Sequence, residues 1–247
     1  MKQDEHFKFS TGVIAYPIAI TLIIWLVFWA DVRFGFDFYK YGIYPKTLVG
    51  LRGILLRPFI HGDIYHIYHN TIPLFMLSMA LFYFYRPIAW KVLFFGIVFS
   101  GLLTWLIGRQ SYHIGASGLI YVLVSFIFFK GVFAKYFRLI ALSLAIVFIY
   151  GSMIWYVFPV KENMSWEGHL SGLIVGFVFA LVFRKSIAKP KKYKWEEEGY
   201  NEDDDPFLKH FDENGNFIER PEEPEEKIEE EPNKIRITYQ FKSNKED

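Results

Sequence analysis

Four polar side chains in apolar stretches of this 247-residue chain carry groups that suit the hydrolysis of an amide bond. Ser117 offers a hydroxyl nucleophile, and His169 offers an imidazole base. His66 and Asn70 offer hydrogen-bond donors. A serine hydroxyl needs an adjacent base, and a histidine can take its proton and later return it to a leaving amine. These residue types indicate acyl-transfer chemistry.

The surroundings of Ser117 favour a negative charge. The string Gly115-Ala-Ser-Gly118 opens an apolar run that predicts a helix. The first backbone N–H groups of a helix lack intrahelical partners, and the helix dipole there attracts anions. An oxyanion forming beside Ser117 would therefore meet donors. His66 and Asn70 are spaced i, i+4 on one helix face, so their side chains could complete an oxyanion site.

The surroundings of His169 favour close contact with another helix. Gly168, Gly172 and Gly176 recur every four residues, and small residues at this spacing let helices approach closely in lipid. If the neighbour is the helix that begins at Ser117, His169 meets that serine. Tyr121 lies one turn after Ser117 on the same face, where its ring could support the imidazole.

Six apolar segments are long enough, or nearly so, to cross a bilayer and carry these residues. We predict spans at Gly12–Ala30, Ile64–Tyr85, Val92–Gly108, Ile114–Phe129, Leu139–Val160 and Gly168–Phe183. The second, fourth and sixth spans run in the same direction, and each begins with one or more of the four polar residues. The site residues should therefore share one depth near the surface where these three spans begin. Polar groups inside a membrane are costly and by default suggest a functional site.

The distribution of Lys and Arg predicts the orientation. With the N-terminus inside, thirteen lie in inner segments: Lys2, Lys8, Arg86, Lys91, Lys130, Lys135, Arg138, Arg184, Lys185, Lys189, Lys191, Lys192 and Lys194. Seven lie in outer segments: Arg33, Lys40, Lys46, Arg52, Arg57, Arg109 and Lys161. The excess places both termini in the cytoplasm and opens the site outward. No cleavable leader is evident, so the first span should be retained.

The segments outside the spans differ in character. Residues 1–11 form a short cytoplasmic N-terminus, and residues 12–184 form the membrane domain. Residues 31–63 form a first outer loop that is rich in aromatic residues, which suits the membrane interface. Residues 185–247 form a charged tail with seventeen acidic residues between Glu196 and Glu231, which we expect to be disordered. The alternation of apolar and polar residues from Lys234 to Lys242 is also compatible with a short strand there.

The set of motifs resembles that of the rhomboid family of intramembrane serine proteases. His66-Ile-Tyr-His-Asn70 is similar to the family's His-x-x-x-Asn, and Gly115-Ala-Ser-Gly118 to its Gly-x-Ser-Gly. Gly168-His-Leu-Ser-Gly172 is similar to the His-x-x-Gly of the last core helix. The resemblance covers about residues 51–183. It departs in the first outer loop, where Leu51-Arg52 replaces a frequent Trp-Arg, and at Gly168, where many members have Ala.

The resemblance implies an all-α, six-helix membrane bundle in which Ser117 and His169 form a catalytic dyad. It implies that His66 and Asn70 stabilise the oxyanion, with Gly115, Tyr121 and Gly172 in support. It further implies cleavage of the transmembrane segments of other proteins in the cell membrane. Neither a cofactor nor a metal ion is implied, and the near-neutral charge suggests no nucleic-acid partner.

Two other functions remain open at this point. One is a non-catalytic rhomboid-like protein that binds membrane clients. The other is a transporter, which we disfavour because the predicted spans contain no Asp, Glu, Lys or Arg. His61, His69 and His113 also fall on the outer side, where the simplest interpretation is polar interfacial residues. A metal site is the alternative, but no His-Glu-x-x-His pair supports it.

Overall fold

A computed structural model describes residues 9–134, 136–161, 164–183, 193–196, 198–212 and 214–219 of the chain. The chain divides into two units, residues 1–191 and 192–247. The predicted boundary between membrane domain and tail, after residue 184, falls among residues that are outside the described ranges.

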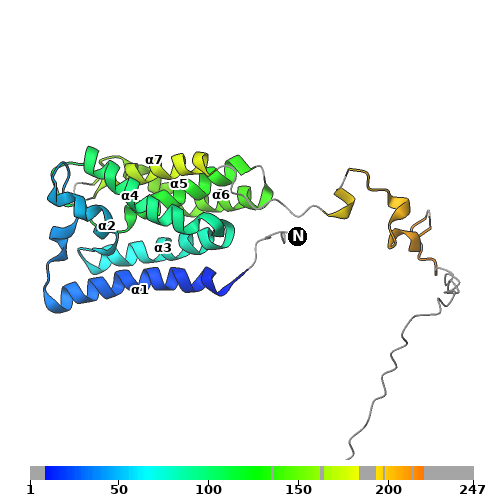
Figure 1. The fold of residues 1–247 in the computed structure, drawn as a ribbon, viewed down its shortest axis with the longest axis horizontal. Helices are drawn as coiled ribbons and strands as arrows, with labels where there is room; N and C mark the ends of the chain where they lie inside the picture. Colours follow the sequence, from blue (N-terminus) through cyan, green and yellow to red (C-terminus); the bar gives the residue numbers. More distant parts are fainter. Residues whose placement is uncertain are drawn as a thin grey trace, which may run out of the picture. The chain divides into compact units, whose positions relative to one another are not determined.

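The first unit is a bundle of long apolar helices (Figure 1). The main helices are α1 (Thr11–Phe34), α3 (Ile64–Phe84), α4 (Ala89–Ile107), α5 (Ser117–Ala134), α6 (Phe137–Tyr150) and α7 (Trp166–Val182). The first five, with the 3₁₀ turns that extend α4 and α6, are long and apolar enough to cross a membrane. The sixth, α7, is apolar but has only 17 residues. The described residues form no strand, so the all-α membrane-bundle prediction is confirmed.

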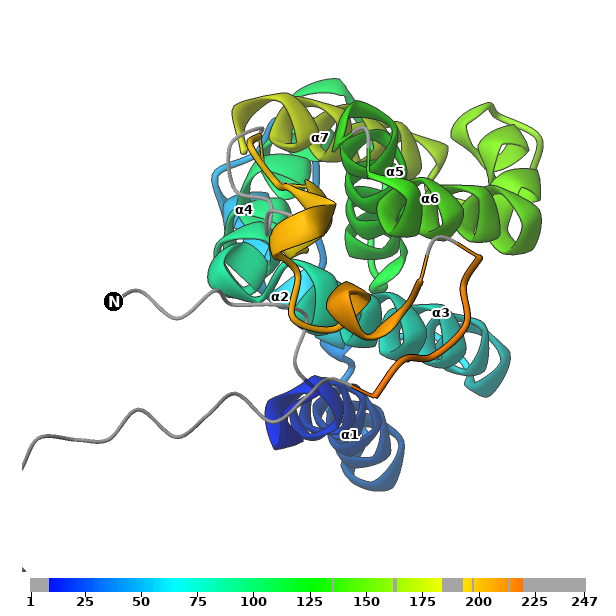
Figure 2. The same ribbon diagram turned by 90° about the vertical axis from the view of Figure 1, so that its right-hand side faces the viewer.

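Helix α5 is the centre of the bundle, and Figure 2 shows it surrounded by α7, α6, α4 and α3. It contacts all four of these helices, whereas α1 packs along α3 at the edge. The side chains Leu123, Phe126 and Ile127 of α5 are fully buried. Because α3, α5 and α7 all begin at the end that carries the first loop, their N-termini form one layer (Figure 1).

The helix bounds differ from the predicted spans in ways that matter for the site. Helix α5 begins at Ser117 rather than at residue 114, and α7 begins at Trp166 rather than at residue 168. The fifth span is not one continuous α-helix, because α6 ends at Tyr150 and the chain continues as the 3₁₀ helix η5 (Gly151–Val157).

The predicted spans contain no charged residue, but the observed helices α5 and α7 extend beyond them and include two buried charged side chains. Glu167 lies in the first turn of α7, and Lys130 lies in α5 beyond the predicted end of that span. Lys130 donates a hydrogen bond to the carbonyl of Phe183, at the C-terminal end of α7, where the helix dipole favours a cation. Glu167 accepts a hydrogen bond from the backbone N–H of Arg109. Each of the two charges therefore has a hydrogen-bond partner.

The first loop folds into short helices that rest on the bundle. It contains η1 (Phe38–Tyr41), η2 (Val49–Arg52), α2 (Gly53–Leu56) and η3 (Arg57–Phe59). The arginine of the Leu51-Arg52 pair is exposed; its guanidinium lies 4.3 Å from the centre of the Tyr41 ring and donates to the Lys40 carbonyl (2.9 Å). Arg52 therefore anchors only its own loop.

The second unit contains single-turn helices in its described part. These are η6 (Lys194–Glu196), η7 (Glu202–Asp204) and η8 (Leu208–His210), followed by one bridge between Phe211 and Phe217. Hydrogen bonds there are local: the Asp212 carboxylate accepts from the backbone N–H groups of Asn214 and Asn216. The possible strand from Lys234 to Lys242 lies outside the described residues.

Candidate active site

Ser117 is the first residue of α5, and backbone hydrogen bonds hold the loop that precedes it. Gly115 has φ of +97°, in the left-handed region that favours glycine. Its N–H donates to the carbonyl of Arg57 (2.9 Å). Two residues earlier, His113 and Ile43 exchange backbone hydrogen bonds as an antiparallel bridge. The loop that precedes the serine is therefore tied to the first outer loop at two points.

His66 and Asn70 converge from α3 on this loop. The Asp63 side chain caps α3 by accepting from the His66 N–H (2.8 Å). A Cβ on Gly115 would lie 2.6 Å from His66 Nε2 and 3.6 Å from Asn70 Nδ2, so glycine is needed for this approach. Asn70 is buried, and its Nδ2 has no hydrogen-bond partner among the described residues. The amide is thus an unused donor beside the backbone that leads into Ser117.

His169 is held in one tautomer by its neighbours. Its Nδ1 lies 2.9 Å from the Tyr156 carbonyl, which can only accept a hydrogen bond, so Nδ1 carries the proton. Nε2 is then unprotonated and available as a base. The imidazole stacks on the ring of Tyr121 with centroids 4.3 Å apart and planes 12° apart.

Helices α5 and α7 touch through their backbones at the level of the site. A Cβ on Gly172 would overlap the Gly118 carbonyl and lie 2.8 Å from Tyr121 Cβ. One turn further on, the Ser125 hydroxyl donates to the Leu173 carbonyl of α7 (2.7 Å). The structure therefore brings His169 onto the face of α5 that carries Ser117 and Tyr121. The half-buried Ser117 hydroxyl makes no hydrogen bond in the described ranges, and such bonds often form only with substrate present.

The three outer-side histidines are not alike. The structure buries His61 and His113, whereas His69 is exposed and bonds its own helix through the Tyr65 carbonyl. The interfacial interpretation therefore fails for the two buried rings. His61 lies with its ring 5.0 Å from that of His66 and its Nε2 3.5 Å from the N–H of Ala116. Burial lowers the pKa of His61 to about 4, so its ring is neutral at pH 7.

His113 joins a chain of hydrogen bonds that caps α7. Burial lowers the pKa of His113, which keeps the ring neutral. Nε2 lies 3.1 Å from the Arg109 carbonyl and must donate to it, so Nδ1 accepts from the Ser165 hydroxyl (2.6 Å). Ser165 in turn accepts from the Gly168 N–H at 3.3 Å. This chain fixes the start of the helix that carries the catalytic candidate His169.

Sequence reasoning missed Ser165, Glu167 and Arg57 as parts of this site. A capping signal was available for the first two: a serine followed two residues later by an acidic residue, just ahead of an apolar run. Nothing in the sequence distinguished Arg57 from an ordinary positive charge of the outer loop. No group of three or more His, Asp or Glu side chains within the described residues is arranged to hold a metal ion.

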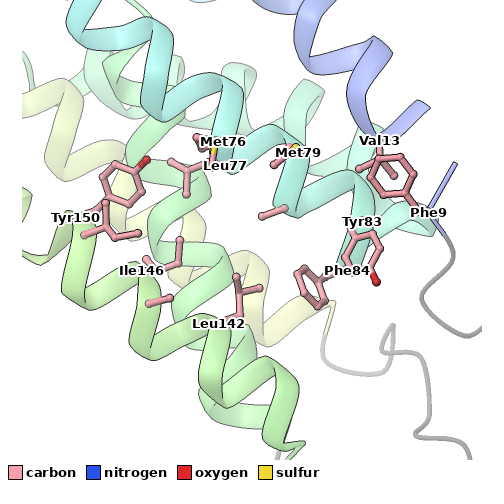
Figure 3. Close-up of a pocket in the computed structure, with 13 residues that line it drawn as sticks. Phe9, Val13, Met76, Leu77, Met79, Tyr83, Phe84, Leu142, Ile146 and Tyr150 are labelled. Carbon is pink, nitrogen blue, oxygen red and sulfur yellow. The ribbon is translucent and has the colours of Figure 1, made fainter. Parts of the chain in front are cut away.

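An apolar cavity of about 390 Å³ lies apart from these polar groups, between α1, α3 and α6. Figure 3 shows the side chains that face it, among them Val13 of α1, Met76 of α3, and Leu142 and Ile146 of α6. The cavity lies between α3 and α6, and its apolar lining offers an apolar surface within the membrane-spanning region.

Comparison with known proteins identifies the family. The model of the Rhomboid domain matches residues 50–186, which is more than half of the chain. The chain belongs to the rhomboid family. This rhomboid is also 32% identical over 169 residues to uncharacterized proteins of Mycobacterium bovis and Mycobacterium tuberculosis, covering 62% of this chain and 68% of theirs. An uncharacterized protein of Mycobacterium leprae is 32% identical over 160 residues, covering 58% of this chain and 61% of its own.

Membership confirms that this rhomboid is a multi-pass membrane protein with the expected fold. The matched segment includes the loop from Gly50 onward and all three helices whose N-termini form the polar layer. The names of these relatives, all uncharacterized proteins, assign no activity.

Proposed function

We propose that this rhomboid is an intramembrane serine endopeptidase with a Ser117–His169 dyad. The observation that carries the proposal is the tautomer and position of the His169 imidazole. The Tyr156 carbonyl fixes the proton on Nδ1, and the Tyr121 ring holds the imidazole on the face of α5 that begins with Ser117. An unprotonated Nε2 beside a serine at a helix N-terminus is the arrangement that nucleophilic amide hydrolysis requires.

The reaction follows from these positions. His169 Nε2 removes the proton as Ser117 Oγ attacks the scissile carbonyl, and the carbonyl oxygen becomes an oxyanion. The unused amide of Asn70, His66 Nε2 in its protonated tautomer and the unpaired N–H groups at the start of α5 can donate to that oxyanion. The imidazolium then protonates the leaving amine, and a water molecule hydrolyses the acyl-enzyme by the reverse sequence. Gly115, Tyr121 and Gly172 support this geometry, and no cofactor or metal is required.

The orientation is part of the proposal. The excess of Lys and Arg in inner segments supports cytoplasmic termini, comprising residues 1–11 and the tail from residue 185 onward. The site then opens toward the outer surface of the cell membrane, because α3, α5 and α7 begin there. The proposed membrane domain between these termini comprises residues 12–184.

Transmembrane segments of other proteins are the proposed substrates. The polar layer lies at the ends of apolar helices, and the cavity beside α6 offers an apolar surface to a segment approaching through the lipid. A scissile bond must leave its helix before it can react, because helical backbone groups are already hydrogen-bonded. Substrates should therefore contain helix-weakening residues near the outer interface.

The test is cleavage of a transmembrane reporter by the full-length chain in liposomes. We expect Ser117→Ala to lower kcat by at least about 1,000-fold without changing thermal stability, because the nucleophile is lost. Ser111→Ala, a serine in the loop a few residues earlier, is the matched control and should cleave normally. Cleavage that survives Ser117→Ala would refute the dyad. A wild-type protein that binds the reporter without cleaving it would instead support the non-catalytic, client-binding function.

A further inference from the structure

Arg57 is a buried cation in the first outer loop. It is 3% exposed and lies at the start of η3, ahead of the first helix of the polar layer. Its Nη1 donates to Thr104 Oγ1 (3.0 Å), and its Nη2 donates to Ser100 Oγ (2.9 Å). Both acceptors belong to α4 and lie one turn apart, so the planar fork of the guanidinium matches their spacing.

The guanidinium also lies against the two helices that carry the dyad. A Cβ on Gly118 of α5 would overlap Nη2 and lie 2.9 Å from Cζ. A Cβ on Gly168 of α7 would lie 3.2 Å from Nη1. Gly118 directly follows Ser117, and Gly168 directly precedes His169. The absence of a side chain next to each dyad residue therefore leaves the room that the guanidinium fills.

The backbone of the same residue reaches the other side of the serine. The Arg57 carbonyl accepts from the Gly115 N–H at 2.9 Å, two residues before Ser117. Arg57 thus contacts the chain on both sides of the nucleophile and also the residue before the base.

Stability alone is a poor reason for an arginine here. Burial lowers the pKa of Arg57 to about 10, so the group stays charged at neutral pH and bears the cost of leaving water. No carboxylate lies within ion-pair distance of it among the described residues. Its charge also faces the N-termini of α5 and α7, where the helix dipoles disfavour a cation. An apolar side chain would fill this space at lower cost.

We propose that Arg57 is a positioning residue that sets the separation and alignment of Ser117 and His169 by filling the space between the starts of α5 and α7. Its fork is fixed to α4 by Ser100 and Thr104, and its flat face determines how closely Gly118 and Gly168 approach. The proposal rests on the proposed peptidase function. It assigns to this loop a role beyond that of the exposed Arg52, which bonds only within the loop.

The experiment compares Arg57→Met, Arg57→Lys and the control Arg52→Met in the full-length chain in liposomes. The readouts are kcat and KM for a transmembrane reporter, and the rate of Ser117 labelling by a fluorophosphonate, each per folded molecule. We expect Arg57→Met to lower kcat and the labelling rate by about 10- to 100-fold, since small misplacements of reacting groups have this effect. KM should stay within about twofold, and Arg52→Met should match the wild type.

The lysine variant separates positioning from charge. A lysine keeps the charge but cannot bond both hydroxyls with a planar fork, so we expect Arg57→Lys to stay within about threefold of Arg57→Met. Full activity of Arg57→Lys would overturn the proposal, because charge alone would then suffice. Equal activity of Arg57→Met and Arg52→Met would overturn it as well.

A second variant keeps the proposal testable if Arg57→Met does not fold. Ser100→Ala with Thr104→Val leaves Arg57 in place but removes both of its anchors on α4. We expect about a 3- to 10-fold loss of kcat and labelling rate at unchanged KM, and wild-type rates in this variant would overturn the proposal. Failure of the peptidase function itself is distinguishable, because the wild-type protein would then show neither cleavage nor Ser117 labelling.

Discussion

The α5–α7 pair and helix α6 differ sharply in how they are held. In the apolar stretch of α5, 61% of the residues are buried, compared with 17% in the stretch that combines α6 and η5. Helices α5 and α7 meet through glycine backbones and an interhelical hydrogen bond. Helix α6 also bonds α5, through the Ser143 hydroxyl and the Phe128 carbonyl (2.9 Å), but it exposes Leu144 and Phe148 to its surroundings and borders the apolar cavity.

Under the proposed function, the difference separates a region that needs precision from one that allows access. The proposed reaction requires closely held groups, which agrees with Ser117 and His169 lying on the pair of helices with backbone contact. A proposed transmembrane substrate would approach through lipid, which agrees with the looser packing next to α6. The two regions are also linked at the site, because η5, which directly follows α6, supplies the Tyr156 carbonyl that orients His169 and the Met153 carbonyl that accepts from the Tyr121 hydroxyl (2.6 Å).

The largest effect on stability is expected from adding one methyl group between α5 and α7. Gly172→Ala should lower the free energy of unfolding by about 3 kcal/mol and reduce cleavage, because the new Cβ meets the backbone of Gly118. Thermal unfolding in detergent and reporter cleavage measure the two effects.

Gly151→Ala is the matched control on the α6 side. Its Cβ would meet only Val147 Cγ1, at 3.5 Å, and its φ of −60° suits alanine. We expect a change of less than about 0.5 kcal/mol or a slight stabilisation. Equal losses from the two substitutions would remove the contrast between the regions.

A smaller effect on stability is expected from the protonation of His61, which lies next to the polar layer. The pKa of His61 is about 4 in the folded protein and near 6.5 when the chain is unfolded, so its contribution is present above pH 6.5. As the pH falls from 6.5 to 4, the unfolded state gains a proton that the folded state does not, and about 2–3 kcal/mol of stability is lost.

His61→Gln should flatten this loss, because glutamine does not titrate. Unfolding midpoints measured between pH 7 and pH 4 provide the comparison, with His69→Gln as the control at an exposed histidine. An unchanged pH profile in His61→Gln would show that the ring is accessible to protons in the folded state and that the polar layer is more open than described.

Much of this architecture could be predicted because it follows from local pattern. Apolar length predicts the spans, and the placement of Ser117 and His169 at the starts of spans in the same direction predicts one layer. The break between α6 and η5 could not be predicted, since the apolar composition continues through it. The burial of Arg57 and Glu167 depends on contacts between distant segments, so the sequence predicted Arg57 only as a charge of the outer loop and did not indicate the burial of Glu167.

The Ser117–His169 dyad is tested most directly by the site of fluorophosphonate labelling in the full-length protein. We predict that mass spectrometry finds the label on Ser117 alone, and that His169→Ala abolishes labelling in a protein that remains folded. Labelling of a different serine, or an unchanged labelling rate at Ser117 in His169→Ala, would contradict the assignment of His169 as the base that activates Ser117.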